Sequence, residues 1–371
     1  MIKNTILSLF LVLGSMTLTA QEKDSTKEGR DGTNYKDKPI VTNVTNTIFM
    51  LKGMGGNIAV QDGIDGVLMI DTQFERISKF IEDIVERETE KKVEFIINTH
   101  HHGDHVGGNK NFSREGATII AHKNVRNLMT NALIEKEGLA LRKKLEEDIN
   151  AAEKQQKGSG KVEQLKQTIA TRMEQQMEKI EMDHEALPAI SFDNDLLFHY
   201  NDEDIQLIYT PNAHTNGDIL VYFPKSNVMH TGDAFVNMLY PFIDAENGGS
   251  YTGYLNGLKR IENLANKETK IIPGHGELAS ISNVQELSRV LELYYTRIKT
   301  AFLQNKTEDQ VAAMRDFTKI YDDKGYGDGF ITTEAFLRSI YKEVEKNEGA
   351  YKRRNDAKQK KYEESQKKAG N

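Results

Sequence analysis

The sequence predicts a mixed α/β fold in which two runs of short strands are separated by a long helical insertion. The first run lies within residues 47–121 and the second within residues 196–272. Between them, residues 123–182 are rich in charged, helix-favouring side chains. In both runs, predicted strands are followed by glycine together with histidine or aspartate. Because α/β sheets commonly carry their functional sites at strand ends, the same pattern predicts where the site lies.

The first twenty residues are predicted to be a secretory signal peptide and not part of the fold. Lys3 gives a positive start, residues 6–13 form an apolar run, and small residues ending at Ala20 precede Gln21. The segment is too short and wrongly flanked for a stable membrane anchor, and no later apolar run could span a bilayer. We therefore expect export, to a bacterial periplasm, with residues 21–38 as a flexible N-terminal segment.

The composition narrows the classes of protein that fit. The 371 residues contain no cysteine, which excludes disulfides and thiolate ligands anywhere in the chain. A net charge of -7 gives no indication of nucleic-acid binding. We expect a small-molecule substrate as the partner. A homo-oligomer, or a protein partner bound through the helical insertion, remains open.

In the first run, the segments between turn residues have β-type composition. Strands are predicted at residues 47–51, 57–61, 66–70, 93–97 and 118–121. The third strand ends at Asp71, and a helical pattern follows from Phe74 to Ile84. Asp71 is therefore predicted to support the site, to cap that helix, or both.

Four of the ten histidines fall within the six residues 100–105, directly after a predicted strand. Neutral imidazole is mainly useful as a metal ligand or a proton carrier. His100 and His102 lie two apart, so in an extended segment they point to the same side and could hold one ion. A turn at the following glycine would reorient Asp104 and His105, and a second ion would explain them. A histidine-rich surface loop, the alternative, leaves the aspartate unexplained. Nitrogen and oxygen ligands suit zinc.

The insertion at residues 124–185 is predicted to be a helical hairpin. Two segments with apolar residues at helical spacing flank the break Gly158-Ser159-Gly160. The Met and Leu stripe favours packing within the hairpin or against the domain. A partner-binding arm remains the alternative.

The second run repeats the strand-end pattern. Strands are predicted at residues 196–200, 205–209, 219–223, 228–230 and 270–272, with a helix at residues 251–265. His214 lies on a loop between two strands, Asp233 follows a third strand in Thr-Gly-Asp, and His275 follows the last in Pro-Gly-His-Gly. Each could be an ordinary loop or turn residue. Their repeated position favours one shared site.

The rest of the chain is predicted to be helical. Helices are expected at residues 284–298, 308–317 and 333–344. A glycine-rich acidic stretch at residues 322–331 does not fit the ligand positions of a calcium loop, so we predict a turn there. The domain layout is then a main domain at residues 39–290, a helical extension at residues 291–345, and a charged, solvated tail at residues 346–371.

The sequence resembles the metallo-β-lactamase superfamily, whose signature His-x-His-x-Asp-His is matched by residues 100–105. Asp71 after its strand, His214 in His-Thr-Asn-Gly-Asp, Asp233 in Thr-Gly-Asp and His275 in Pro-Gly-His-Gly extend the resemblance over roughly residues 40–290. It implies an αββα sandwich with a metal site along one edge of the two sheets.

The resemblance also implies the ligand sets. One zinc would be held by His100, His102 and His214, and the other by Asp104, His105 and His275, with Asp233 bridging. A hydroxide held between two cations is ionised near neutral pH and can attack an electrophile. Asp104 would orient that water and relay its proton as the catalytic residue, and Asp71 would support the histidine loop. Iron-dependent relatives usually carry glutamate where this chain has His102, which favours zinc, although the ligands also admit iron or manganese.

Together these features predict an exported dizinc hydrolase acting on a small ester, lactone, thioester or β-lactam. Members that hydrolyse β-lactams often have cysteine or serine in place of Asp233, so the aspartate looks more like the thioesterase, lactonase and phosphodiesterase branches. The alternatives are a phosphodiesterase of the same fold and a non-hydrolytic metal-binding or partner-binding protein. Candidate substrate contacts, which could equally be turn or cap residues, are Asn216, Asp218, Tyr240 and Asp244.

Overall fold

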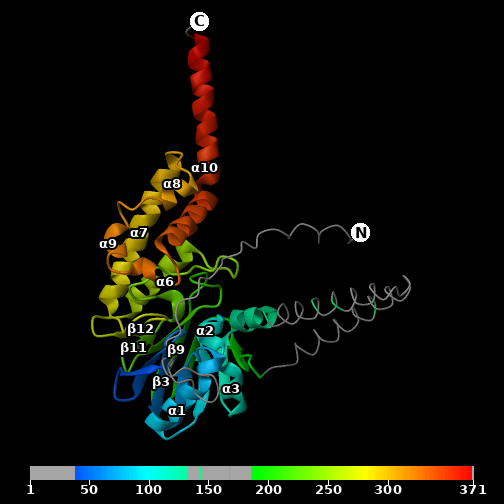
Figure 1. Ribbon diagram of the computed structural model, residues 1–371, viewed down its shortest axis with the longest axis vertical. Coiled ribbons are helices and arrows are strands. Elements are labelled where there is room, and N and C mark those ends of the chain that lie inside the picture. Colours follow the sequence, from blue (N-terminus) through cyan, green and yellow to red (C-terminus); the bar gives the residue numbers. More distant parts are fainter. Residues whose placement is uncertain (1–37, 133–142, 144–146, 148–166, 168–184, 370–371) are drawn as a thin grey trace. The chain divides into compact units, whose positions relative to one another are not determined.

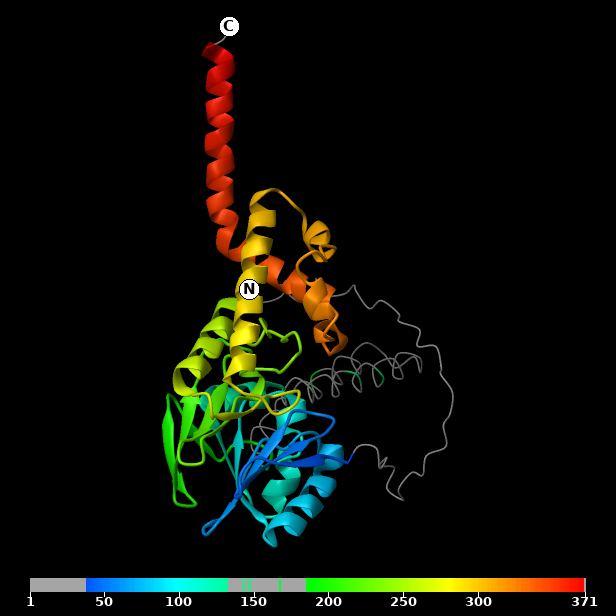
Figure 2. The same ribbon diagram turned by 90° about the vertical axis from the view of Figure 1, so that its left-hand side faces the viewer.

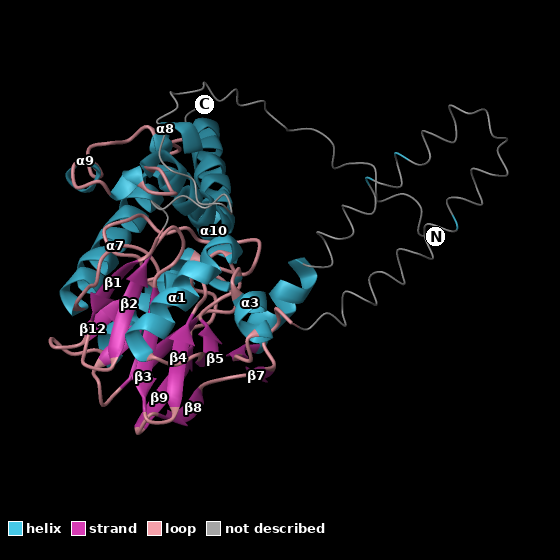
Figure 3. Ribbon diagram, turned by 60° about the horizontal axis from the view of Figure 1, so that its bottom comes forward, coloured by secondary structure: helices cyan, strands magenta, loops and turns pink. Residues whose placement is uncertain are grey.

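The computed structural model describes residues 38–132, 143, 147, 167 and 185–369, which form two β-sheets with helices on the outer face of each (Figure 1; Figure 3). The predicted signal peptide and nearly all of the predicted segment at residues 21–38 lie outside the described residues. Most of the predicted hairpin also lies outside the described residues. Its beginning is described, and residues 123–132 are helical. Within the described residues, no helix is long and apolar enough to cross a membrane.

The first sheet contains seven of the described strands in chain order. They are β1 (Ile40–Asn43), β2 (Ile48–Lys52), β3 (Ile58–Gly63), β4 (Gly66–Ile70), β5 (Val93–Asn98), β6 (Thr118–His122) and β7 (Ile190–Phe192). Pairs from β1 to β4 are antiparallel, and pairs from β4 to β7 are parallel. The predicted strands of the first run are confirmed within two residues. Strands β1 and β7 were not predicted.

The second sheet contains five described strands. Their order is β12 (Lys270–Ile272), β11 (Val228–His230), β10 (Ile219–Phe223), β9 (Glu203–Tyr209) and β8 (Leu196–Tyr200). Only β11 and β12 are parallel, because the helix α6 (Tyr251–Leu264) connects them. As a result, β11 and β12 both end at the same edge of the sheet.

The layers follow from side-chain alternation along the strands. In β4, Leu68 and Ile70 pack toward the second sheet, whereas Val67 and Met69 pack toward the helix α1 (Ser78–Thr89). Residues in register with Ile70 continue its row across the first sheet: Met50, Ala59, Ile97 and Ile120. This row meets apolar residues of β9 and β10 in one buried cluster. The predicted αββα sandwich is confirmed.

Helices on the outer face of the second sheet come from both the main domain and the C-terminal extension. The helices α7 (Ile281–Leu303) and α10 (Thr333–Ala369) lie side by side (Figure 2) and share a buried cluster with α6. The predicted helix at residues 308–317 is wrong beyond residue 312, where α8 (Glu308–Ala312) ends. The chain turns there so that Phe317 packs against Tyr294. Helix α10 continues well past the predicted end at residue 344, and the side chains of residues 353–361 are exposed.

Candidate metal centre

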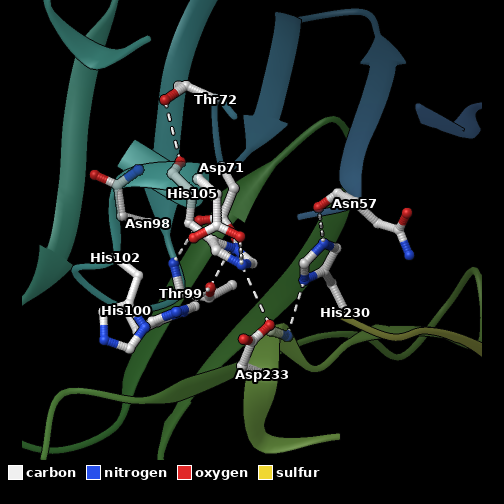
Figure 4. Close-up of polar contacts among 12 residues, drawn as sticks. Asn57, Asp71, Thr72, Asn98, Thr99, His100, His102, His105, His230 and Asp233 are labelled. Atoms are coloured by element: carbon white, nitrogen blue, oxygen red, sulfur yellow. Dashed lines mark hydrogen bonds and ion pairs between the residues drawn. The ribbon is translucent and has the colours of Figure 1, made fainter. Parts of the chain in front are cut away.

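All seven predicted ligands come together where strands of both sheets end. Figure 4 shows His100, His102, His105 and Asp233 among them. The residues after β5 carry His100 and His102, and the short helix α2 (Gly103–Val106) then presents Asp104 and His105. The β9–β10 loop carries His214, and Asp233 and His275 follow the parallel strands β11 and β12. The turn expected at Gly103 is thus the start of a helix, with His102 as its N-cap.

His100, His102 and His214 form the first set. Their ring centroids lie 4.9 Å apart for His100 and His102 and 4.8 Å apart for His100 and His214. The Nε2 of His214 lies 2.8 Å from the Nδ1 of His102. The other nitrogen of each ring donates elsewhere, His214 to the Phe242 carbonyl and His102 to Asp244. Two nitrogen lone pairs therefore face each other, and they are stable at this distance only with a cation or a proton between them.

Asp104, His105 and His275 form the second set. The Oδ2 of Asp104 lies 3.2 Å from the Nε2 of His275 and 3.6 Å from the Nε2 of His105. His105 is fully buried, whereas the side chains of Asp104 and His275 retain 26% and 30% exposure. The second set therefore opens toward solvent on the side of Asp104 and His275.

Asp233 lies between the two sets. Its Oδ1 is 3.2 Å from the Nε2 of His105 and 3.5 Å from the Nε2 of His275, and its Oδ2 is 3.5 Å from the Nε2 of His214. Burial alone would raise the pKa of Asp233, but the neighbouring His275 and His105 hold it well below its usual range. An ionised carboxylate with one oxygen toward each set suits a bridging ligand.

The donor atoms fit metal ions. The Nε2 atoms of His100 and His105 and the Oδ1 of Asp233 are buried and have no hydrogen-bond partner among the described residues. Leaving a buried polar atom unsatisfied costs about 1–3 kcal/mol each. Burial also lowers the pKa of His214 to about 4, so its imidazole stays neutral and keeps a lone pair available. The set lacks sulfur, and imidazole with carboxylate suits zinc.

Each of four imidazoles has its outer nitrogen fixed by a hydrogen bond, which turns the other nitrogen toward the centre. His105 Nδ1 donates to Asp71 at 2.8 Å, and His102 Nε2 donates to Asp244 at 2.9 Å. His214 Nδ1 donates to the Phe242 carbonyl at 2.6 Å, and His100 Nδ1 to the hydroxyl of Thr99 at 3.1 Å. Sequence reasoning missed Thr99 and Phe242. A backbone carbonyl leaves no residue-type signal, but Thr99 directly precedes the cluster.

Asp71 is placed to support the histidine loop. It is fully buried, and its Oδ1 accepts from the Thr99 amide at 2.8 Å while its Oδ2 accepts from the Thr99 hydroxyl at 2.7 Å and from His105. The prediction that Asp71 caps the next helix is wrong. A 3₁₀ turn, η2 (Glu75–Ile77), intervenes, and Ile77 is the N-cap of α1.

The candidate substrate contacts have other partners in the structure. Tyr240 is buried in the core. Its hydroxyl contacts the hydroxyl of Tyr294 and the carboxylate of Asp322, so Tyr240 offers no surface to a substrate. Asp218 accepts from the amide and hydroxyl of Thr215, and burial raises its pKa to about 8. Asn216 accepts from Tyr209 and is half-buried. Both belong to the loop that carries His214.

A further network, which sequence reasoning also missed, holds the loops of Asp233 and His275. The amide of Asn57 donates to the Pro273 and Gly276 carbonyls at 2.9 Å, and its own carbonyl accepts from His230 at 2.9 Å. His230 in turn accepts from the backbone amide next to Asp233. The backbone also approaches the centre closely. A Cβ at Gly274 would lie 2.0 Å from Asp233 Oδ1, so only glycine fits there.

The sequence matches the profile of the metallo-beta-lactamase superfamily over residues 52–275, more than half of the chain. A solved metallo-beta-lactamase from Pontibacter korlensis is similar in fold at 14% identity and a TM-score of 0.49, with 68% of this chain and 99% of that chain covered. The DIM-1 metallo-beta-lactamase is similar at 13% identity and a TM-score of 0.47, with 69% and 98% covered. A comparison with curated protein sequences finds no match. The profile match includes every candidate ligand, and the chain belongs to the metallo-β-lactamase superfamily.

Proposed function

We propose that the protein is an exported dizinc hydrolase that cleaves a small ester, lactone, thioester or β-lactam. The observation that carries the proposal is the position of Asp233, whose two oxygens face different sets of candidate ligands. The proposed ligands of one zinc are His100, His102 and His214, and those of the other are Asp104, His105 and His275, with Asp233 shared. Export is inferred from the leader-like residues 1–20.

Zinc ions bound there would supply Lewis acidity and a water molecule that ionises near neutral pH. The protein's own residues orient the reaction. Asp104 keeps 26% of its side chain exposed and lies 3.2 Å from His275, so it can position an attacking water and take up its proton. The hydrogen bonds from His105 to Asp71 and from His102 to Asp244 fix the imidazoles in place.

The choice among substrates rests on residue 233. An aspartate there resembles the thioesterase and lactonase branches of the superfamily more than the members that hydrolyse β-lactams. The chain matches the metallo-beta-lactamase superfamily profile, which keeps β-lactams among the substrates to be tested. Export places the substrate outside the cytosol.

The test is elemental analysis of the zinc-loaded protein combined with a substrate panel. The panel contains a chromogenic cephalosporin, an aryl ester, a lactone, a thioester and a phosphodiester. We expect two zinc ions per chain, turnover of at least one carbonyl substrate, and a mature chain that begins at Gln21. Turnover of the phosphodiester alone would reassign the site to a phosphodiesterase. No turnover of any substrate by fully loaded protein would refute the hydrolase.

A ligand variant tests the assignment separately. His102→Ala should lower the zinc content to one ion per chain and remove nearly all activity, while the circular dichroism spectrum stays that of the parent. Full zinc content in this variant would show that His102 is not a ligand.

A further inference from the structure

Two phenylalanine rings lie exposed beside the candidate metal centre. Phe242 is 40% exposed and Phe330 is 88% exposed, and their centroids lie 5.8 Å apart in an edge-to-face arrangement. Phenylalanine is usually buried, so an exposed contacting pair indicates a surface that binds something apolar.

Phe242 forms the edge of the first ligand set. Its ring centroid lies 6.0 Å from that of His102 and 5.8 Å from that of His214, and its carbonyl accepts from His214. A ligand held at this set therefore has an apolar wall directly beside it.

Phe330 comes from the C-terminal extension, at the end of the glycine-rich turn before α10. The amide of Tyr240 donates to the Tyr326 carbonyl at 3.1 Å, which fixes the turn against the segment that carries Phe242. Gly329 packs so closely on Leu239 that a Cβ would lie 2.9 Å from its side chain. These contacts place Phe330 next to Phe242 and so extend the apolar wall outward from the metal centre.

We propose that Phe242 and Phe330 form a subsite for an apolar group of the substrate, an alkyl or aryl substituent adjacent to the carbonyl that is cleaved. The proposal rests on the hydrolase function proposed above. It makes the C-terminal extension part of the substrate site and selects substrates with a medium-length acyl or aromatic group over small polar ones.

The size and position of the pair favour a substrate over a protein partner. Two rings of roughly 200 Å² each fall well short of the roughly 800 Å² per partner that a stable protein interface buries. Phe242 also borders the ligand imidazoles themselves, so a molecule bound at the centre would contact it directly.

The first experiment compares kcat/KM for p-nitrophenyl acetate, butyrate and octanoate in the zinc-loaded protein. Burying a methylene strengthens an interaction roughly two- to fourfold, so we expect octanoate to exceed acetate by roughly tenfold or more. Phe330→Ala should reduce this ratio several-fold, and Phe330→Leu should restore much of it. The control is Ile320→Ala, which removes a 63% exposed apolar residue of the same extension and should leave the ratio unchanged.

A second experiment separates the subsite from the hydrolase. Calorimetry with acetate, hexanoate and octanoate measures binding to the zinc-loaded protein without turnover. If no ester is cleaved but octanoate binds more tightly than acetate and Phe330→Ala removes the difference, the hydrolase fails and the subsite stands. Cleavage with no dependence on chain length, or a chain-length dependence that Phe330→Ala does not alter, would overturn the subsite. So would a dimer that Phe330→Ala converts to a monomer without changing chain-length selectivity.

Discussion

Asp71→Asn should weaken metal binding in the second set while leaving the fold intact. Asp71 is fully buried and accepts three hydrogen bonds, from the amide and hydroxyl of Thr99 and from His105. Its φ of 65° lies in the left-handed region, which asparagine tolerates as well as aspartate. The substitution therefore changes one acceptor into a donor without changing shape.

The orientation of the new amide is dictated by Thr99. The backbone N–H of Thr99 can only donate, so the asparagine oxygen must take the place of Oδ1, and the asparagine nitrogen must then face His105 Nδ1. His105 can accept that bond only in the tautomer with its proton on Nε2. This is the nitrogen that should hold the metal. The displaced proton finds an acceptor in Asp233 Oδ1 at 3.2 Å, so the folded state loses only the bond that the Thr99 hydroxyl donates to Oδ2.

Loss of such a supporting contact typically costs roughly 10- to 100-fold in metal affinity. Competition with a chromophoric chelator should show that loss for one of two zinc ions, with the other within roughly threefold of the parent. The control is Asp218→Asn, because Asp218 also accepts from a threonine amide and hydroxyl but contacts no ring nitrogen of a candidate ligand. Asp71→Asn protein that binds two zinc ions with the parent affinity would refute the reasoning.

Three other predictions concern the same residues and their surroundings. Removing metal with a chelator should lower the melting temperature by several degrees, reversibly on adding zinc, because the unpartnered atoms of His100, His105 and Asp233 lose their ligand; calorimetry with no shift would contradict metal binding. Asn57→Ala should destabilise by about 1–3 kcal/mol in urea unfolding and weaken zinc binding, because the Pro273 and Gly276 carbonyls lose their donor. Burial lowers the pKa of His122, so its contribution is present above about pH 6.5, the usual pKa of an unfolded histidine, and is lost as the pH falls through the lower folded value. His122→Asn removes the stacking of the imidazole on Tyr209, so the variant should be less stable than the parent at pH 7 in urea unfolding. The difference should narrow toward pH 5, because only the parent then has to bury a histidine that tends to become charged.

The bounds of strands that lead to the site could be predicted closely from the local sequence. β4, β10, β11 and β12 have the predicted bounds, since each is a short apolar run between turn residues. The missed strands are edge-like and weakly patterned. β1 has the burial pattern exposed, half-buried, half-buried, exposed, and β7 lacks any fully buried residue. Such strands form because neighbouring strands offer hydrogen bonds, which a local pattern does not record.

The site also has one part that the sequence predicts, the candidate ligands, and another part that depends on the fold, the groups that hold them in place. The candidate ligands could be named because their residue types and spacing are those of a known signature, and the structure places them together. What fixes each imidazole was only partly predictable. Asp71 was identified from its place after a strand, but Asp244 was one of several loop candidates, and the carbonyl of Phe242 depends on the fold alone. Tyr240 shows the converse, since a polar aromatic near the site turned out to belong to the core.

The two halves of the proposed centre differ in the charge of their ligands but share one supporting arrangement. The first set consists of neutral imidazoles, and the second contains Asp104, with Asp233 common to both. Behind each set, however, one imidazole donates to a buried carboxylate: His102 to Asp244, and His105 to Asp71. Because a carboxylate behind an imidazole raises its basicity, each half receives negative charge that does not come from a ligand. Two divalent ions would bring four positive charges, which the carboxylates of Asp71, Asp104, Asp233 and Asp244 balance in sum, so the Lewis acidity of the ions, and not a net positive charge, would stabilise the negative charge that develops on a carbonyl oxygen during hydrolysis. Asp71 contacts a candidate ligand of the second set directly and reaches the first only through Thr99, whereas Asp244 contacts the first set, so their variants can distinguish the two sites without removing a ligand from either.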